Sequence, residues 1–131
     1  MITVLTGGTG GAKFVDGLRQ IVPAEELMIV VNTGDDIVWW GLYISPDIDS
    51  IAYMLADKLS QERGFGVKGD TLFCLGAMEQ LGQPAWFRVG DRDLATHILS
   101  SGRNCWLKAK RWLRPLPKSC RGWVCGRGFC R

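Results

Sequence analysis

The feature that most constrains this chain is a short apolar stretch that runs directly into a glycine-rich turn at its start. Residues 2–6 read Ile-Thr-Val-Leu-Thr, and residues 7–11 read Gly-Gly-Thr-Gly-Gly before Ala12 and Lys13. Glycines have no Cβ, so their N–H groups can approach an anion closely, and a helix N-terminus adds partial positive charge. The pattern therefore predicts a phosphate-binding turn between a first strand and a helix, to which Lys13 can add a full charge.

The glycine turn departs from two well-known phosphate motifs. A P-loop requires Gly-Lys-Ser/Thr at its end, and the full dinucleotide fingerprint requires a glycine at position 13, where Lys13 stands. A tight turn with no ligand therefore stays an alternative.

The pattern of apolar residues predicts an α/β fold. We expect strands at residues 2–6 and 27–31, with a helix over residues 11–21 between them. The continuous apolar run of the second strand suits a buried parallel strand, and the spacing fits a right-handed βαβ unit. The first helix is expected to bury Phe14, Val15, Leu18 and Ile21.

Three further helices are expected. The first begins at Asp49 or Ser50 and continues to about Leu59, and the third begins at Asp91. The second runs from Asp70 through Leu81 and is expected to bury Leu72, Phe73, Ala77 and Met78. Gly82 ends the second of these. Residues 32–48 are expected to form a long loop.

Composition divides the chain near residue 99. All thirteen Asp and Glu lie at or before Asp93, whereas nine of the sixteen Lys and Arg, four of the five Cys and three of the six Trp lie after it. Shifting the reading frame of the codons for residues 104–112 yields a helix-forming sequence that continues the pattern of Ile98 and Leu99. We therefore interpret residues 1–99 as one part of a domain and residues 100–131 as an out-of-frame, poorly ordered tail.

The basic tail has other interpretations. A nucleic-acid-binding arm would explain its basic residues and tryptophans, a zinc site would use its four cysteines, and disulfides would need an oxidising compartment. The cysteines lack Cys-x-x-Cys spacing. The chain shows no secretory leader pattern and no apolar run of bilayer length, so we expect a cytoplasmic protein.

Polar residues follow both predicted strands. Ligands of open α/β sheets bind outside the carboxyl ends of the strands. The glycine turn follows the first strand and residues 32–36, Asn-Thr-Gly-Asp-Asp, follow the second. If the strands are neighbours, N–H groups and a lysine would meet two carboxylates that could hold Mg²⁺ against a phosphate.

Two more acidic clusters come later in the chain. Residues 45–49 read Ser-Pro-Asp-Ile-Asp, and residues 90–97 read Gly-Asp-Arg-Asp-Leu-Ala-Thr-His. Their aspartates either serve chemistry or only form turns and helix caps, and a lone histidine is usually a surface or core residue. Trp39 and Trp40 either stack on a flat ring or cover the core.

These four segments, in this order, resemble the CofD family over Met1 to Leu99. Its members are 2-phospho-L-lactate or phosphoenolpyruvate transferases of coenzyme F-420 biosynthesis. The resemblance implies a Rossmann-like, doubly wound, mostly parallel sheet, truncated here because family members are much longer. It also implies Mg²⁺-dependent transfer from a guanosine diphosphate-linked lactate or enolpyruvate to the deazaflavin precursor Fo, with release of GMP. We expect a homodimer at full length, no nucleic-acid or membrane partner, and no activity in this chain by itself.

The resemblance also implies roles for individual residues. Asp35, Asp36 and Asp49 would be catalytic, and Asp47 and Asp49 would bind the metal. Asp49 and Arg88 would contact the acceptor. The other substrate-binding positions would be Gly7, Gly8, Thr9, Gly10, Lys13, Asn32, Thr33, Asp91 and Asp93. Gly11-Ala12 and Trp39-Trp40 depart from the usual family pattern. The alternative function is that of a YvcK-type regulatory protein, which binds nucleotide sugars without transfer chemistry.

Overall fold

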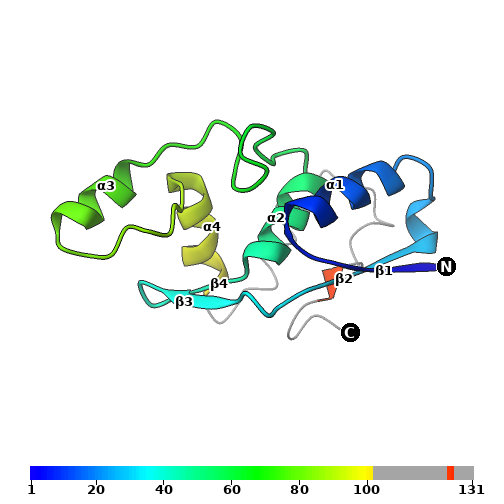
Figure 1. Cartoon of the computed structure of the whole chain (residues 1–131), viewed down its shortest axis with the longest axis horizontal. Coiled ribbons are helices and arrows are strands. Elements are labelled where there is room, and N and C mark those ends of the chain that lie inside the picture. The colour runs from blue at the N-terminus through cyan, green and yellow to red at the C-terminus, as the bar shows by residue number, and fades with distance from the viewer. Residues whose placement is uncertain (102–123, 126–131) are drawn as a thin grey trace.

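Two parallel strands and the helix between them form the first unit of the fold. The computed structural model describes residues 1–101 and the backbone of residues 124–125 (Figure 1). Strand β1 (Ile2–Thr6) pairs in parallel with β2 (Leu27–Val31), in a register that runs from Ile2 opposite Leu27 to Thr6 opposite Val31. Both strand predictions and the α/β class with a parallel sheet are confirmed.

A third strand adds to this sheet from the predicted tail. Strand β5 (Val124–Cys125) pairs in parallel with β2, so the strand order is β1-β2-β5. The rest of the predicted tail, residues 102–123 and 126–131, lies outside the described residues. The boundary at residues 99 and 100 therefore stays a prediction.

Helix α1 (Gly8–Leu18) begins three residues earlier than expected and buries a different stripe. Ala12 and Val15 are fully buried, whereas Phe14 and Ile21 are exposed. The prediction for Phe14 was wrong because the face that meets β1 and the neighbouring helix α2 (Pro46–Leu55) carries residues 12 and 15, at helical i, i+3 spacing. The prediction for Ile21 was wrong because the helix ends at Leu18. Figure 1 shows α1 and α2 on the same side of β1 and β2.

The expected loop over residues 32–48 contains a β-hairpin, which the sequence did not reveal. Strands β3 (Ile37–Trp39) and β4 (Leu42–Ile44) are antiparallel, and Trp40 and Gly41 form the turn with φ values of 49° and 77°. Positive φ at both turn residues suits the right-handed twist of a two-residue hairpin, but tryptophan is an unusual residue there. The usual Asn-Gly or Asp-Gly signal is missing, which explains the wrong prediction.

The hairpin carries a second, aromatic core. Trp39 is buried together with Ile44, Val89 and Leu94. Its ring lies 4.9 Å from that of Trp86 and 5.8 Å from that of Phe87, both edge-on. Of the two interpretations of Trp39, the structure supports the covering of a core.

Helix α2 begins at Pro46, so the predicted start at Asp49 or Ser50 was wrong. Ser45 is the N-cap residue, without a capping hydrogen bond from its side chain, and proline suits the first helical turn. The helix ends at Leu55, earlier than predicted, and Asp57 follows it with a φ of 55°. The short 3₁₀ helix η1 (Ala24–Glu26) precedes β2.

Helix α3 (Phe73–Gln80) begins later than the predicted start at Asp70 and buries Leu75. Phe73 and Ala77 are exposed, so their predicted burial was wrong. Gly82 ends this helix as expected. It has a φ of 77°, its N–H donates to the Glu79 carbonyl at 2.9 Å, and the Gln83 N–H donates to the Met78 carbonyl at 2.9 Å. This pair of hydrogen bonds is a Schellman motif, which favours glycine.

Helices α3 and α4 (Asp91–Ser100) cap each other. The Asp70 carboxylate accepts hydrogen bonds from the N–H groups of Arg92 and Asp93, at 2.8 and 3.0 Å. The Asp91 carboxylate accepts hydrogen bonds at the start of α3, from residues 73 and 74 at 3.1 and 2.9 Å. The sequence predicted that each aspartate caps the helix that follows it directly. The two capping roles are in fact exchanged, because the start of each helix lies beside the loop that precedes the other.

Candidate active site

The glycine turn is held by a carboxylate from another helix. Gly7 is the N-cap residue of α1 and has no side chain to cap it, whereas the N–H of Gly8 donates to Asp47 Oδ1 at 2.8 Å. A Cβ on Gly7 would lie 2.5 Å from Asp47 Oδ2 and 3.0 Å from the Asn32 Cβ. The turn therefore requires glycine at position 7, because the chain's own carboxylate comes so close.

Asn32 joins the end of β2 to the same carboxylate. Its N–H donates to the Thr6 carbonyl at 2.8 Å, and its side-chain Oδ1 accepts from the Gly34 N–H at 3.0 Å. Its Nδ2 then donates to Asp47 Oδ2 at 2.9 Å. The loops after the two parallel strands thus converge, as the sequence predicted, and the start of α2 joins them.

The other predicted residues of these loops border this point. Asp35 is exposed, and the partly exposed Asp36 lies close enough to Asp49 for its charge to raise the pKa of that carboxyl. Thr9, Gly10 and Lys13 are exposed on the first turns of α1.

Two other predicted site residues, Thr33 and Arg88, also lie in segments between helices and strands. Thr33 accepts a hydrogen bond through its carbonyl from the Asp36 N–H, at 3.4 Å. Arg88 is exposed in the segment between α3 and α4.

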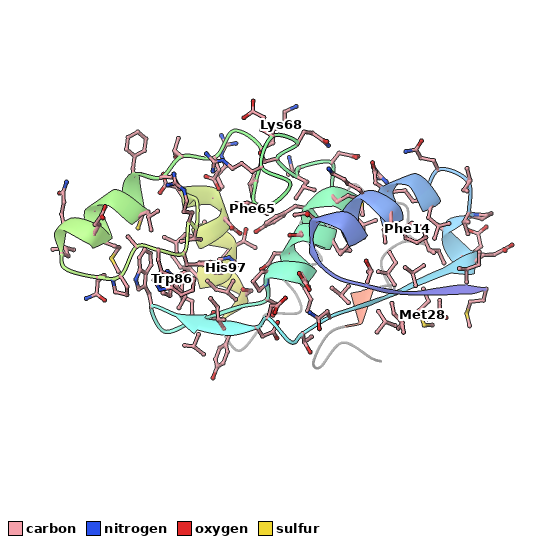
Figure 2. The ribbon with its side chains drawn as sticks, viewed as in Figure 1. Phe14, Met28, Phe65, Lys68, Trp86 and His97 are labelled. Atoms are coloured by element: carbon pink, nitrogen blue, oxygen red, sulfur yellow. The ribbon has the colours of Figure 1, made fainter. Side chains whose placement is uncertain are left out.

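A buried polar cluster joins α2 to α4. On α2, Asp49 and Tyr53 are four residues apart, and on α4 Asp93 and His97 are also four residues apart. The Tyr53 hydroxyl donates to Asp93 Oδ1 at 2.6 Å, and His97 Nε2 lies 3.1 Å from the same oxygen. His97 Nδ1 lies 3.8 Å from Asp49 Oδ2. Figure 2 shows His97 on α4, on the side that faces α2.

Burial changes the acid–base properties of this cluster. Burial raises the pKa of Asp49 to about 7; the charge of His97 opposes this shift, and the charge of Asp93 adds to it. His97 is 1% exposed. Burial alone would lower its pKa, but the hydrogen bond with Asp93 and the charge of Asp49 outweigh this, so the pKa of His97 lies above its usual value. Burial, together with the neighbouring carboxylates, raises the pKa of Tyr53 far above its usual range, which keeps its hydroxyl a donor.

The sequence did not single out Tyr53 and left His97 undecided. The signal that could have found both is the matched spacing, since residues four apart lie on the same face of a helix. The pairs at positions 49 and 53 and at positions 93 and 97 then face each other.

Asp91 and Asp93 are predicted site residues whose structural partners could not be predicted from the sequence. Asp91 caps α3 and also accepts a hydrogen bond from the Thr71 hydroxyl, and Asp93 holds Tyr53 and His97. The expectation that Asp47 and Asp49 jointly bind a metal stays a prediction. Each oxygen of Asp47 accepts one hydrogen bond, from Gly8 or from Asn32, and residues two apart on a helix point to different sides.

The fit of a magnesium ion can be judged from the placement of Asp36 and Asp49. Residues 1–101 contain no group of three His, Cys, Asp or Glu side chains placed to hold a metal ion. Asp49 Oδ2, however, is a buried oxygen without a hydrogen-bond partner, and Asp36 is near it. Because Mg²⁺ in phosphoryl-transfer sites commonly uses one or two carboxylates together with substrate phosphates, this pair fits the protein's share of such a site.

Comparison with known proteins places these features in a family. The sequence model of the family described as "2-phospho-L-lactate transferase CofD" matches residues 2–116. The 2-phospho-L-lactate transferase of Methanosarcina mazei is 43% identical over 98 residues, which are 75% of this chain and 32% of the relative. The phosphoenolpyruvate transferase of Nocardia farcinica is 45% identical over 102 residues, which are 75% of this chain and 30% of that protein. The chain spans about a third of the length of the curated relatives that it matches.

Within the part of the chain that the structure describes, no helix has the length and apolar character needed to cross a membrane.

Proposed function

The chain belongs to the CofD family, and we propose on this premise that it forms part of a transferase of coenzyme F-420 biosynthesis. The enzyme would transfer a 2-phospholactyl or phosphoenolpyruvyl group from a guanosine diphosphate-linked donor to Fo. The observation that best supports this proposal is the convergence of the glycine turn, Asn32 and the carboxylate of Asp47 at the carboxyl ends of β1 and β2. Ligands of parallel α/β sheets bind at this edge.

The proposed reaction is the attack of an acceptor hydroxyl on the donor phosphorus that carries the three-carbon group. A bond forms between the hydroxyl oxygen and that phosphorus, the bond from that phosphorus to the bridging oxygen breaks, GMP leaves, and the hydroxyl loses its proton. Such transfers depend chiefly on positioning and on stabilisation of the phosphoryl charge.

The residues at the edge of the sheet would share these tasks. Thr9, Gly10 and Lys13 would border the donor phosphates, since they are exposed at the start of α1. Asp36 and Asp49 would hold Mg²⁺, which neutralises phosphate charge when bound. Asp35 remains a proposed catalytic carboxylate beside them, and Arg88 remains a proposed contact of the acceptor.

We further propose that the full-length protein acts in the cytoplasm as a homodimer, without nucleic-acid or membrane partners. We propose that the present chain by itself does not turn over. It spans about a third of its curated relatives, and it exposes apolar side chains of its sheet, including Leu5, which is 80% exposed, and Met28 (Figure 2).

The first test is the binding of Fo to the purified chain, followed by Fo fluorescence with and without Mg²⁺. We expect saturable binding that Asp49→Asn weakens and that Glu79→Gln, an exposed substitution on α3, leaves unchanged. Binding of a nucleotide sugar without any binding of Fo would contradict the proposal and favour the YvcK-type function. Release of GMP from a guanosine diphosphate-linked donor by the chain alone would contradict the proposed inactivity.

A further inference from the structure

We infer that Asp47 is a positioning residue of the glycine turn, which it holds in the anion-binding conformation together with Asn32, and that it does not itself bind a metal or a substrate. This inference rests on the proposed function, because the anion it serves is the phosphate of the proposed donor.

The first argument is that each carboxylate oxygen of Asp47 already accepts a hydrogen bond from another segment of the chain. Its side chain is 8% exposed. Oδ1 accepts the Gly8 N–H at 2.8 Å, and Oδ2 accepts the Asn32 Nδ2–H at 2.9 Å. One side chain on the first turn of α2 therefore connects two segments that lie 39 and 15 residues away in sequence.

The second argument is that the orientation of the Asn32 amide is fixed from its other end. Asn32 Oδ1 accepts the Gly34 N–H at 3.0 Å, so the amide nitrogen must face Asp47. The Asn32–Asp47 pair is thus matched donor to acceptor at each contact, and neither side chain can rotate without losing a hydrogen bond.

The third argument is that the glycine turn has closed around this pair. A Cβ at position 7 would overlap Asp47 Oδ2, and Gly8 adopts a φ of +64°. The carboxylate takes one of the free N–H groups at the start of α1, where a negative charge is also favoured by the helix dipole. Thr9 and Gly10, which are exposed on the next positions of the helix, remain to meet a phosphate.

The pair offers a charge-conserving test by exchange of its two residues. In Asp47→Asn alone, the new amide nitrogen faces either the Asn32 amide or the Gly8 N–H, so one contact joins two donors. In Asn32→Asp alone, two carboxylates face each other. In the double variant Asn32→Asp/Asp47→Asn, the new Asp accepts from Gly34 and from the new Asn, and the new Asn accepts from Gly8. All three hydrogen bonds and the net charge are restored.

The experiment uses the present chain, residues 1–131, labelled with ¹⁵N. Pyrophosphate is titrated with and without Mg²⁺, while the amide signals of Thr9 and Gly10 report binding and the exchange rate of the Gly8 amide reports the contact with residue 47. Glu79→Gln serves as the control for loss of one negative charge. We expect each single variant to lower pyrophosphate affinity and to accelerate Gly8 exchange, each by about tenfold, as for the loss of a charge-assisted hydrogen bond. The double variant should recover both values to within about twofold of the wild type and keep its response to Mg²⁺.

Three results would overturn the inference. Unchanged or tighter pyrophosphate binding in Asp47→Asn would show that the carboxylate only repels the anion. A double variant no better than the weaker single variant would show that the pair does not position the turn. Loss of the Mg²⁺ response in the double variant, with Gly8 exchange restored, would identify Asp47 as a metal ligand. If the wild type binds no pyrophosphate, the proposed donor site fails, and with it the role of Asp47 in anion binding, whereas Gly8 exchange still shows whether the pair holds the turn.

Discussion

Replacing Asp70 by alanine removes the oxygen atoms that cap α4. Asp70 accepts the Arg92 N–H at 2.8 Å and the Asp93 N–H at 3.0 Å, which are two of the four N–H groups that the first turn of a helix leaves unpaired. Loss of a capping side chain costs about 1 to 2 kcal/mol of the free energy of unfolding. For a folded region of about 100 residues, this corresponds to a fall in Tm of roughly 5 to 10 °C.

The geometry at Gly90 makes the prediction sharper. A Cβ at position 90 would overlap Asp70 Oδ2, although the φ of Gly90, −81°, is one that alanine adopts readily. Gly90→Ala therefore has to displace the Asp70 carboxylate and should cost about as much as Asp70→Ala itself. When both changes are combined, the carboxylate is already gone, so the second change should add little.

The assay is equilibrium unfolding of the full chain in urea, followed by circular dichroism, for the wild type, the two single variants and the double variant. We expect a coupling free energy of about 1 kcal/mol or more between the two positions. Glu79→Gln should stay close to the wild type. Additive effects of the two changes, or an Asp70→Ala variant as stable as the wild type, would refute the exchanged capping of α3 and α4.

Three further outcomes follow from other contacts. Gly7→Ala should destabilise the chain by about 1 to 3 kcal/mol because its Cβ would lie 2.5 Å from Asp47 Oδ2, whereas Gly10→Ala, which meets no atom within 4 Å, should be neutral or stabilising in the same urea titration. Equal effects would contradict this reading. The hydrogen bonds at the start of α3, that from the Thr71 hydroxyl above all, lower the pKa of Asp91. Its contribution to stability is therefore complete well above 3.8, the ordinary value, and is lost as the pH falls below 3.8 and through the lowered pKa of the folded state. Asp91→Asn should therefore reduce the acid sensitivity of unfolding, and an unchanged pH profile would count against the cap. Tyr53→Phe should cost about 1 to 2 kcal/mol through loss of its hydrogen bond to a carboxylate, and an unaltered urea midpoint would show that this bond contributes nothing.

Local patterns were sufficient for the first unit of the fold. Strands β1 and β2 are where their apolar runs predict them, because a buried parallel strand needs little beyond continuous hydrophobicity. The limits of α1 and α2 and the hairpin at Trp40-Gly41 were not predictable in this way. Packing against the sheet selects the buried face of α1, and the hairpin turn uses a tryptophan that carries no turn signal.

The sequence by itself determined the parallel α/β class, the glycine turn and the order of motifs that marks the family. It could not decide which atom each aspartate would meet. Asp47 holds the glycine turn and Asp49 lies beside His97. Asp70 caps α4 and Asp91 caps α3, so each caps a helix other than the one that follows it directly. All four occur in similar local sequences before or within helical turns. A carboxylate accepts a hydrogen bond from any suitably placed donor. In these contacts the partners of the four aspartates stand 15 to 48 positions away, and the packing of α2 and α4 against the strands and loops brings them within hydrogen-bond or ion-pair reach.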